Sequence, residues 1–194
     1  MSLDATVDAI EGIEQLILQK ISNIHTCMPG TVLSFDAGSC RASVKPTLKF
    51  YTIDDRTLDY PVIDGVPVFM PHAGGAQITY PVKAGDSCLI VFSERSIDEW
   101  LGEGSEDNHD PRRFDMTDGF CFVGMMPSQS ISADNVEIIN GGTRISLTPG
   151  NTINIVGNIN VQGTITCSGD VLGSGISLVG HTHSYHHGNT SSSQ

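Results

Sequence analysis

The chain of 194 residues is long enough for one full domain with an appendage, or for two small units. Its formal net charge of −12 repels phosphate backbones, so no nucleic-acid partner is expected. The chain has no apolar run of the ~18 residues that a membrane span needs, and its scattered cysteines lack a C-x-x-C pair, which is typical of small buried side chains in a reducing compartment.

The N-terminal segment, residues 1–26, is predicted to be a helix. Apolar side chains recur there at spacings of three, four or seven residues: Leu3, Val7, Ile10, Ile17, Ile21 and Ile24. Two interpretations stay open, an amphipathic helix packed on its own domain and a short parallel coiled coil about a threefold axis. Glu14 stands at a seam position and counts against the coiled coil.

The next segment, residues 27–128, changes to the alternation of β-strands. Leu33 to Phe35 and Cys40 to Val44 alternate on either side of the turn Asp36-Ala37-Gly38-Ser39, which predicts a hairpin. Further short strands are expected over residues 66–70, 76–80, 87–92 and 120–123, with one helical turn at residues 97–101. These elements together predict a Greek-key barrel of the OB type.

Residues 129–180 form a repeat with little charge. Glycines recur every five to seven residues from Gly150 to Gly180, and pairs of apolar residues lie between them: Ile145 and Leu147, Ile153 and Ile155, Ile159 and Val161, Ile165 and Cys167, Ile176 and Leu178. Such short periods are typical of β-solenoids and intertwined β-helices. Two inward side chains per strand cannot build a core alone, and short strands leave their edges unpaired. Three chains about one axis solve both problems, so a homotrimer is predicted; a disordered linker is the alternative.

The last segment, residues 181–194, opens with His181-Thr182-His183. Alternate residues of an extended strand share a face, so both imidazoles can point to the threefold axis. Three chains would then supply six nitrogens in an octahedron, an arrangement that suits iron(II), or nickel or cobalt in its place, better than zinc, calcium or magnesium. His181 and His183 are therefore the predicted metal ligands. His186 and His187 are either extra or outer partners of the site, or part of an exposed polar terminus.

Several stretches of the chain match one known family: Gly30-Thr31-Val32, Val44-Lys45-Pro46, Val66-Pro67-Val68, Tyr80-Pro81-Val82-Lys83-Ala84-Gly85-Asp86, Arg95-Ser96-Ile97-Asp98-Glu99-Trp100-Leu101, Asp118-Gly119-Phe120 and His181-Thr182-His183. In these stretches the sequence resembles the central spike proteins of contractile-tailed phages and R-type pyocins. The resemblance implies an N-terminal OB-fold domain, a triple-stranded β-helix and an apex where His-x-His from three chains holds one iron ion. Ser184 and the His186-His187 pair depart from the family pattern at the tip.

The expected fold is therefore mainly β: an N-terminal helix, an OB-fold barrel and an intertwined triple-stranded β-helix in a homotrimer. By the resemblance, the chain is a non-enzymatic spike at the baseplate tip of the virion, assembled in the host cytoplasm. Baseplate hub and tail-tube proteins are the expected partners. Sheath contraction would drive the spike through the outer membrane of a Gram-negative host.

Two other function classes fit parts of the sequence. A trimeric short tail fibre would bind a receptor or glycan through its OB-type domain. A metalloenzyme would need an open coordination position and a nearby base, and six imidazoles leave no such position. Paired carboxylates for wall cleavage would have to come from the acidic segment, namely Glu94, Asp98, Glu99, Glu103, Glu106 and Asp107, which also fits a solvated loop.

Overall fold

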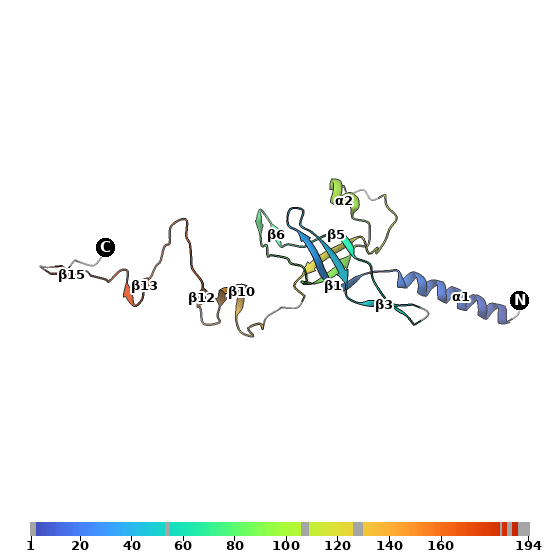
Figure 1. Ribbon diagram of the computed structural model, residues 1–194, viewed down its shortest axis with the longest axis horizontal. Helices are drawn as coiled ribbons and strands as arrows, with labels where there is room; N and C mark the ends of the chain where they lie inside the picture. The colour runs from blue at the N-terminus through green and yellow to red at the C-terminus, as the bar shows by residue number, and fades with distance from the viewer. Residues whose placement is uncertain are drawn as a thin grey trace. The chain divides into compact units, whose positions relative to one another are not determined.

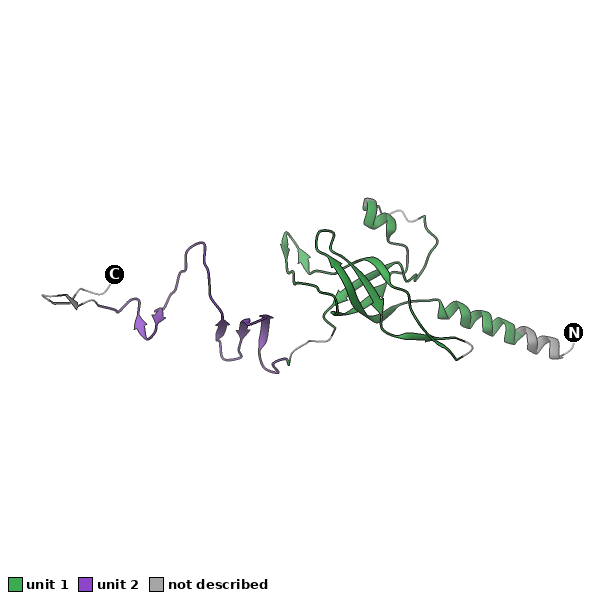
Figure 2. Cartoon of the chain, in the orientation of Figure 1, with its two compact units in different colours: residues 1–130 green, residues 131–194 purple. Residues whose placement is uncertain are grey.

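The computed structural model describes residues 3–52, 55–105, 109–125, 130–182, 184–185 and 188–189. Its secondary structure is mainly β with few helices (Figure 1), which confirms the predicted mainly β class; the homotrimer stays a prediction. The chain divides into two compact units, Met1–Ser130 (unit 1) and Ile131–Gln194 (unit 2), shown in Figure 2. None of the helices in the described ranges combines the length and the apolar character of a membrane span.

Helix α1 (Leu3–Ser22) occupies the predicted helical segment. From Ile10 onward its apolar side chains are exposed, with values between 51% at Ile17 and 61% at Leu16. The interpretation in which this face packs on the chain's own domain is therefore wrong for the described side chains. Beyond α1 the chain joins the barrel at His25, whose N–H donates to the carbonyl of Phe114 at 3.2 Å.

Five strands of unit 1 form a curled sheet in the order β5-β2-β1-β8-β9. They are β1 (Cys27–Asp36), β2 (Arg41–Pro46), β5 (Ile63–Pro67), β8 (Ser87–Phe92) and β9 (Gly119–Val123). The two edge strands meet where Val68 bridges Cys121 in parallel and the N–H of Phe69 donates to the carbonyl of Cys121 at 2.9 Å. A register shift between Val32 and Ser34 of β1 marks a bulge, which helps a sheet to bend. This closure of five strands matches the predicted OB-type barrel.

Smaller elements fill the connections of the barrel. They are the hairpin of β3 (Lys49–Tyr51) with β4 (Thr57–Asp59), the hairpin of β6 (His72–Ala73) with β7 (Ala76–Gln77), and α2 (Asp98–Glu103). The helical turn predicted at residues 97–101 is thus present as α2. The strand expected over 66–70 is wrong in its bounds, because β5 begins at Ile63 and ends at Pro67. The strand expected over 76–80 shortens to the two residues of β7.

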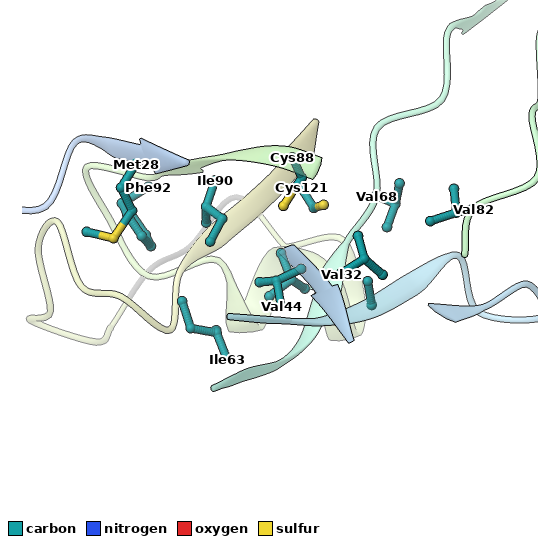
Figure 3. Packing of buried hydrophobic residues seen from close by; sticks show 12 residues of the cluster. Met28, Val32, Val44, Ile63, Val68, Val82, Cys88, Ile90, Phe92 and Cys121 are labelled. Carbon is teal, nitrogen blue, oxygen red and sulfur yellow. The ribbon is translucent and has the colours of Figure 1, made fainter. Parts of the chain in front are cut away.

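The barrel core comes from strict alternation in its strands. In β2 and β8 every second side chain is buried, as period two requires when one face of a strand points inward. The buried cluster, drawn in Figure 3, consists of Met28, Val32, Ala42, Val44, Ile63, Val66, Val68, Val82, Cys88, Ile90, Phe92 and Cys121. A methyl group at Gly30 would lie 2.7 Å from Cδ1 of Ile90, so that position admits only glycine without a shift of Ile90. Cys88 and Cys121 are buried as expected, whereas Cys27 and Cys167 are exposed.

Unit 2 holds a three-stranded antiparallel sheet and two small hairpins. The sheet is β10 (Val136–Asn140), β11 (Thr143–Leu147) and β12 (Ile153–Val156), and the hairpins pair β13 (Leu172–Gly173) with β14 (Ile176–Ser177) and β15 (Ser184–Tyr185) with β16 (Gly188–Asn189). The strands expected at residues 159–161 and 165–167 are absent from the described single chain. A strand needs a partner for its backbone groups, and this chain offers none to those residues.

Candidate assembly surface and histidine apex

One face of the β10–β11–β12 sheet is made of apolar side chains. Antiparallel partners that stand directly opposite share a face of the sheet. The register pairs Val136 with Leu147 and Ile138 with Ile145, and β12 adds Ile155 opposite Ile145 and Ile153 opposite Leu147. We call these six residues the apolar ladder: Val136, Ile138, Ile145, Leu147, Ile153 and Ile155.

The apolar ladder is uncovered in the single chain. Its side chains are between 37% exposed, at Ile145, and 68% exposed, at Val136. The opposite face is mixed: it carries Glu137, Arg144, Ser146 and Asn154 together with Ile139 and Val156, and Nη1 of Arg144 lies 3.4 Å from Oε1 of Glu137. The aliphatic side chains are therefore concentrated on the ladder face, and the described residues leave them exposed.

The rest of unit 2 also exposes apolar side chains. Beyond the sheet, exposed large apolar side chains continue along the chain at Ile159, Val161, Ile165, Val171, Leu172, Ile176, Leu178 and Val179. Among the residues of unit 2 that the structure describes, only Ser146 is buried, and its side chain is polar. Unit 2 thus has no hydrophobic core of its own within the described residues, and its sheet ends in two open edges at β10 and β12.

The β13–β14 hairpin leads directly to the predicted metal ligands. Oδ1 of Asp170 accepts the N–H of Val179 at 3.2 Å, and the hydroxyl of Ser177 accepts the N–H of Gly180 at 2.6 Å. The hydrogen bond from the Ser177 side chain, followed by that backbone N–H, lowers the pKa of Asp170 below its ordinary value. The carboxylate therefore favours this turn while it is ionised, and the contribution is lost as the pH falls through the lowered pKa.

His181 is held through its backbone and its ring. Its N–H donates to the carbonyl of Ser177 at 3.2 Å, and its Nδ1 lies 2.9 Å from the carbonyl oxygen of Leu178. Because a carbonyl oxygen only accepts, this contact assigns the proton to Nδ1. The neutral ring then carries its lone pair on Nε2, the arrangement in which metal-binding histidines are oriented by a backbone carbonyl.

The predicted pair of ligands is described at one of its two positions. His183 lies outside the described residues, as do His186 and His187. His181 follows the turn at Gly180 and precedes β15, so it is placed by the hairpin and not by a strand of its own. The donor chemistry of His181 fits an imidazole ligand, and the structure adds no further ligand from the described part of the chain.

A second group of charged residues closes the long β8–β9 connection around Arg112. The guanidinium donates to the hydroxyl of Ser96 at 2.7 Å and to the hydroxyl of Thr117 at 3.0 Å, and it forms an ion pair with Asp98. Its Nη2 lies 3.6 Å from Oδ1 of the fully buried Asp118. Burial raises the pKa of Asp118, against the opposing effects of the Ile97 N–H, which donates to Oδ1 at 3.1 Å, and of Arg112.

The carboxylates considered for wall cleavage lie in ion pairs or hydrogen bonds with nearby side chains where the structure describes those contacts. Asp98 pairs with Arg112, and Oε1 of Glu94 lies 3.5 Å from Nη1 of Arg113. Oε1 of Glu99 lies 3.3 Å from Nδ1 of His109. Glu106 and Asp107 lie outside the described residues, and nothing is described of the Glu103 side chain. The described carboxylates thus contribute to the order of the loop.

The barrel also carries an open apolar groove between the β1–β2 turn and α2. Its volume is about 600 Å³, and its lining includes Arg41, Phe69, Met70, Trp100, Leu101 and Phe122. The rings of Phe69 and Phe122 stack with centroids 5.0 Å apart, and both side chains are partly exposed. In OB folds, the loops after the first and fourth strands border the usual ligand site. The groove occupies the corresponding place on this barrel.

Strand β10 and the role of Arg112 were not predicted from the sequence. Strand β10 was not predicted, although Val136 and Ile138 alternate with polar Glu137 ahead of the turn at Gly141-Gly142, which is a usable strand signal. Arg112 was not singled out, and no local pattern identifies it, because Ser96 lies sixteen residues away from it in the sequence.

These features define a class of protein: a closed OB-type barrel and a β-rich unit whose apolar ladder has no partner within the chain. A profile described as the Phage protein Gp138 N-terminal domain matches residues 28–124, half of the chain, from β1 past the end of β9. The chain belongs to this family of phage proteins, which supports a structural role in the phage particle. No curated protein matches the chain.

Removal of the Arg112 guanidinium tests whether it secures the β8–β9 connection. Arg112→Met is expected to lower the free energy of unfolding of unit 1 by about 1.5–3 kcal/mol, because it removes charged hydrogen bonds and leaves Asp118 buried without a counter-charge. Urea denaturation followed by the fluorescence of Trp100, the single tryptophan, measures the change. Arg113→Met is the matched control, since its exposed pair with Glu94 is worth about 0–1 kcal/mol. Equal effects of the two variants would contradict the assignment.

Proposed function

We propose that this phage protein is the central spike of a contractile-tail baseplate, a homotrimer in which three copies of unit 2 wind into a triple-stranded β-helix. The observation that carries the proposal is the apolar ladder, six aliphatic side chains on one sheet face that the single chain leaves exposed. Exposed apolar patches of this kind mark sites where another surface docks. A threefold axis lets identical ladders cover one another with one kind of contact.

The energetics favour assembly over an isolated unit 2. Full burial of a Val, Leu or Ile side chain contributes about 1.5–3 kcal/mol. Ordering the backbone costs about 1–2 kcal/mol per residue, so exposed ladders cannot hold short strands in place alone. In the trimer, neighbouring chains would supply strand partners for the residues of 159–167 that have none in one chain. The open edges at β10 and β12 would pair in the same way.

The function of such a spike is mechanical. Contraction of the sheath would press the trimer against the outer membrane of the host, and the protein would carry out no catalysis. The barrel would serve as a collar that joins the spike to hub and tail-tube proteins, because its core is complete within one chain and leaves its outer surface for contacts. The protein would thus act as part of the virion tail, after assembly in the host cytoplasm.

A metal ion at the apex is part of the proposal. His181 and His183 of three chains would present six imidazole nitrogens, and the contact of Nδ1 of His181 with the carbonyl oxygen of Leu178 orients the ring in the way that backbone carbonyls orient metal-binding histidines. Iron(II), or another first-row transition metal, suits an all-nitrogen octahedron. The ion would tie together three strand ends that would otherwise fray.

The groove on the barrel favours a second candidate, a trimeric short tail fibre that binds a glycan or receptor. Its partly exposed Phe69, Trp100 and Phe122 offer flat apolar surfaces at the usual ligand site of OB folds. Binding of the purified protein to a host glycan array, lost in Trp100→Ala, is expected for the fibre and not for the spike. Absence of binding leaves the spike as the better proposal.

Native mass spectrometry of the untagged protein tests the copy number and the metal together. We expect a mass of three chains plus one first-row metal ion, with the metal lost when His181 and His183 are both changed to Ala. The double variant keeps the trimer in this proposal, because the apolar ladder remains. A trimer without metal would remove the apex from the proposal, and a monomer would contradict the spike itself.

A charge on the apolar ladder tests the assembly surface directly. Ile155→Asp is expected to abolish the trimer or lower its urea midpoint, because it would bury a carboxylate without a partner. Asn154→Asp is the matched control, since Asn154 is the adjacent residue and lies on the opposite face of β12. Size-exclusion chromatography with light scattering measures both variants. If the two variants assemble equally well, the ladder is not the trimer interface.

A further inference from the structure

Helix α1 carries a heptad pattern that the β-helical part of the proposal does not use. Its seam positions follow one another at alternating steps of four and three residues: Leu3, Val7, Ile10, Glu14, Ile17 and Ile21, and the pattern continues to Ile24, just past the end of the helix. In the heptad notation Val7, Glu14 and Ile21 are a positions, and the others are d positions. The described apolar members of the seam are 48–57% exposed in the single chain, so unit 1 does not cover them.

We propose that the α1 helices of three copies of this chain form a parallel three-stranded coiled coil, a second assembly element besides unit 2. The composition of the seam indicates that α1 packs against other copies of the same helix. Isoleucine at both a and d positions favours three- or four-stranded coiled coils over dimers. Ile21 at a and Ile10 and Ile17 at d meet this condition. The inference rests on the proposed function for its copy number of three.

The residues beside the seam support the same assembly. In a parallel coiled coil, a g residue of one helix faces the e residue of the next heptad on its neighbour. Here Ile13 at g would meet Leu18 at e, and these side chains are 57% and 58% exposed in the single chain. Gly12 and Gln19, at the f positions on the far side, carry no apolar side chain. The apolar stripe is thus widened toward the neighbours; Leu16, at a c position, stays outside it.

The attachment of α1 to the barrel favours a parallel arrangement. Ile24, the last seam residue, directly precedes His25, whose backbone is bound to Phe114, and the carbonyl of Thr26 accepts the N–H of Phe92 at 2.8 Å. Three barrels related by a threefold axis would therefore start their helices from equivalent points. Such tethering raises the effective concentration of the helices. Alone, an exposed helix with Gly12 in its interior would be marginal in water.

Glu14 gives the coiled coil a distinguishing feature. It is the one charged residue in the seam, and in-register chains would place three carboxylates in a single layer. A polar residue at one a position fixes the register at a cost in stability. Replacing it with isoleucine should therefore strengthen α1 assembly, which no model with a free, solvated helix predicts.

Cross-linking of the full-length protein tests the seam. Ile17→Cys and Gln19→Cys are compared in a background where the exposed Cys27 and Cys167 are changed to Ser, and each protein is treated with a short bis-maleimide. Ile17→Cys, at a d position, should give covalent dimers on a denaturing gel. Gln19→Cys, at an f position, should give much less of the covalent dimer. Comparable cross-linking at the two positions would overturn the coiled coil.

A second pair of variants covers the case in which Ile17→Cys weakens the helix. Glu14→Ile should shift loss of the α1 helical circular dichroism signal to higher urea concentration, and Gln15→Ile, at an outer b position, should not. No shift for Glu14→Ile would overturn the inference. If native mass spectrometry shows a trimer but neither the Ile17→Cys cross-link nor the Glu14→Ile shift is seen, the coiled coil is refuted and the proposed spike is unaffected. A monomer would refute the proposed function and, with it, the copy number of three used for the coiled coil.

Discussion

Apolar side chains that a single chain leaves uncovered are the constraint on which the rest of this protein depends. In the barrel, five strands close through Val68 and Cys121 and bury a continuous core. In unit 2, the apolar ladder stands on one face of a sheet and remains exposed, as do the described seam residues Ile10, Ile17 and Ile21 of α1. Since burial of apolar surface is the dominant favourable term in folding, these two parts gain their stability from other copies in our proposal.

In the proposed trimer, a threefold axis would meet both requirements with one symmetry operation. It would give the α1 seam parallel neighbours, and it would give the short strands of unit 2 partners at both edges of the β10–β12 sheet. The barrel needs neither, because each strand in it has two neighbours once β5 and β9 meet near Val68. This difference explains why the barrel suits a collar that presents its surface to other proteins, whereas α1 and unit 2 suit self-assembly.

The barrel could be predicted from the sequence because its signals are local. The turn Asp36–Ser39 is closed by the Asp36 carboxylate, which accepts from the Gly38 N–H at 3.0 Å and the Ser39 hydroxyl at 2.6 Å, and β2 and β8 alternate strictly. The bounds of β5 could not be predicted, because it ends where the chain turns to meet β9, a contact between residues far apart in the sequence. The contact of Arg112 with Ser96 could not be predicted for the same reason, because the two residues lie far apart in the sequence. At the proposed apex, the spacing of the histidines predicts a pair of imidazole ligands, but the ring orientation of His181 depends on a carbonyl supplied by the turn.

The charge distribution gives a physical reason why, in the proposed spike, unit 2 would be the part that enters the membrane. From residue 131 onward the sequence has only four charged side chains, namely Asp134, Glu137, Arg144 and Asp170. Two of them pair across β10 and β11, and Asp170 accepts the N–H of Val179. Ionised groups resist transfer into hydrocarbon far more than hydroxyls and amides do. A spike covered with Thr, Ser and Asn side chains would therefore meet a smaller electrostatic barrier in the outer membrane than the barrel, which carries most of the chain's net charge.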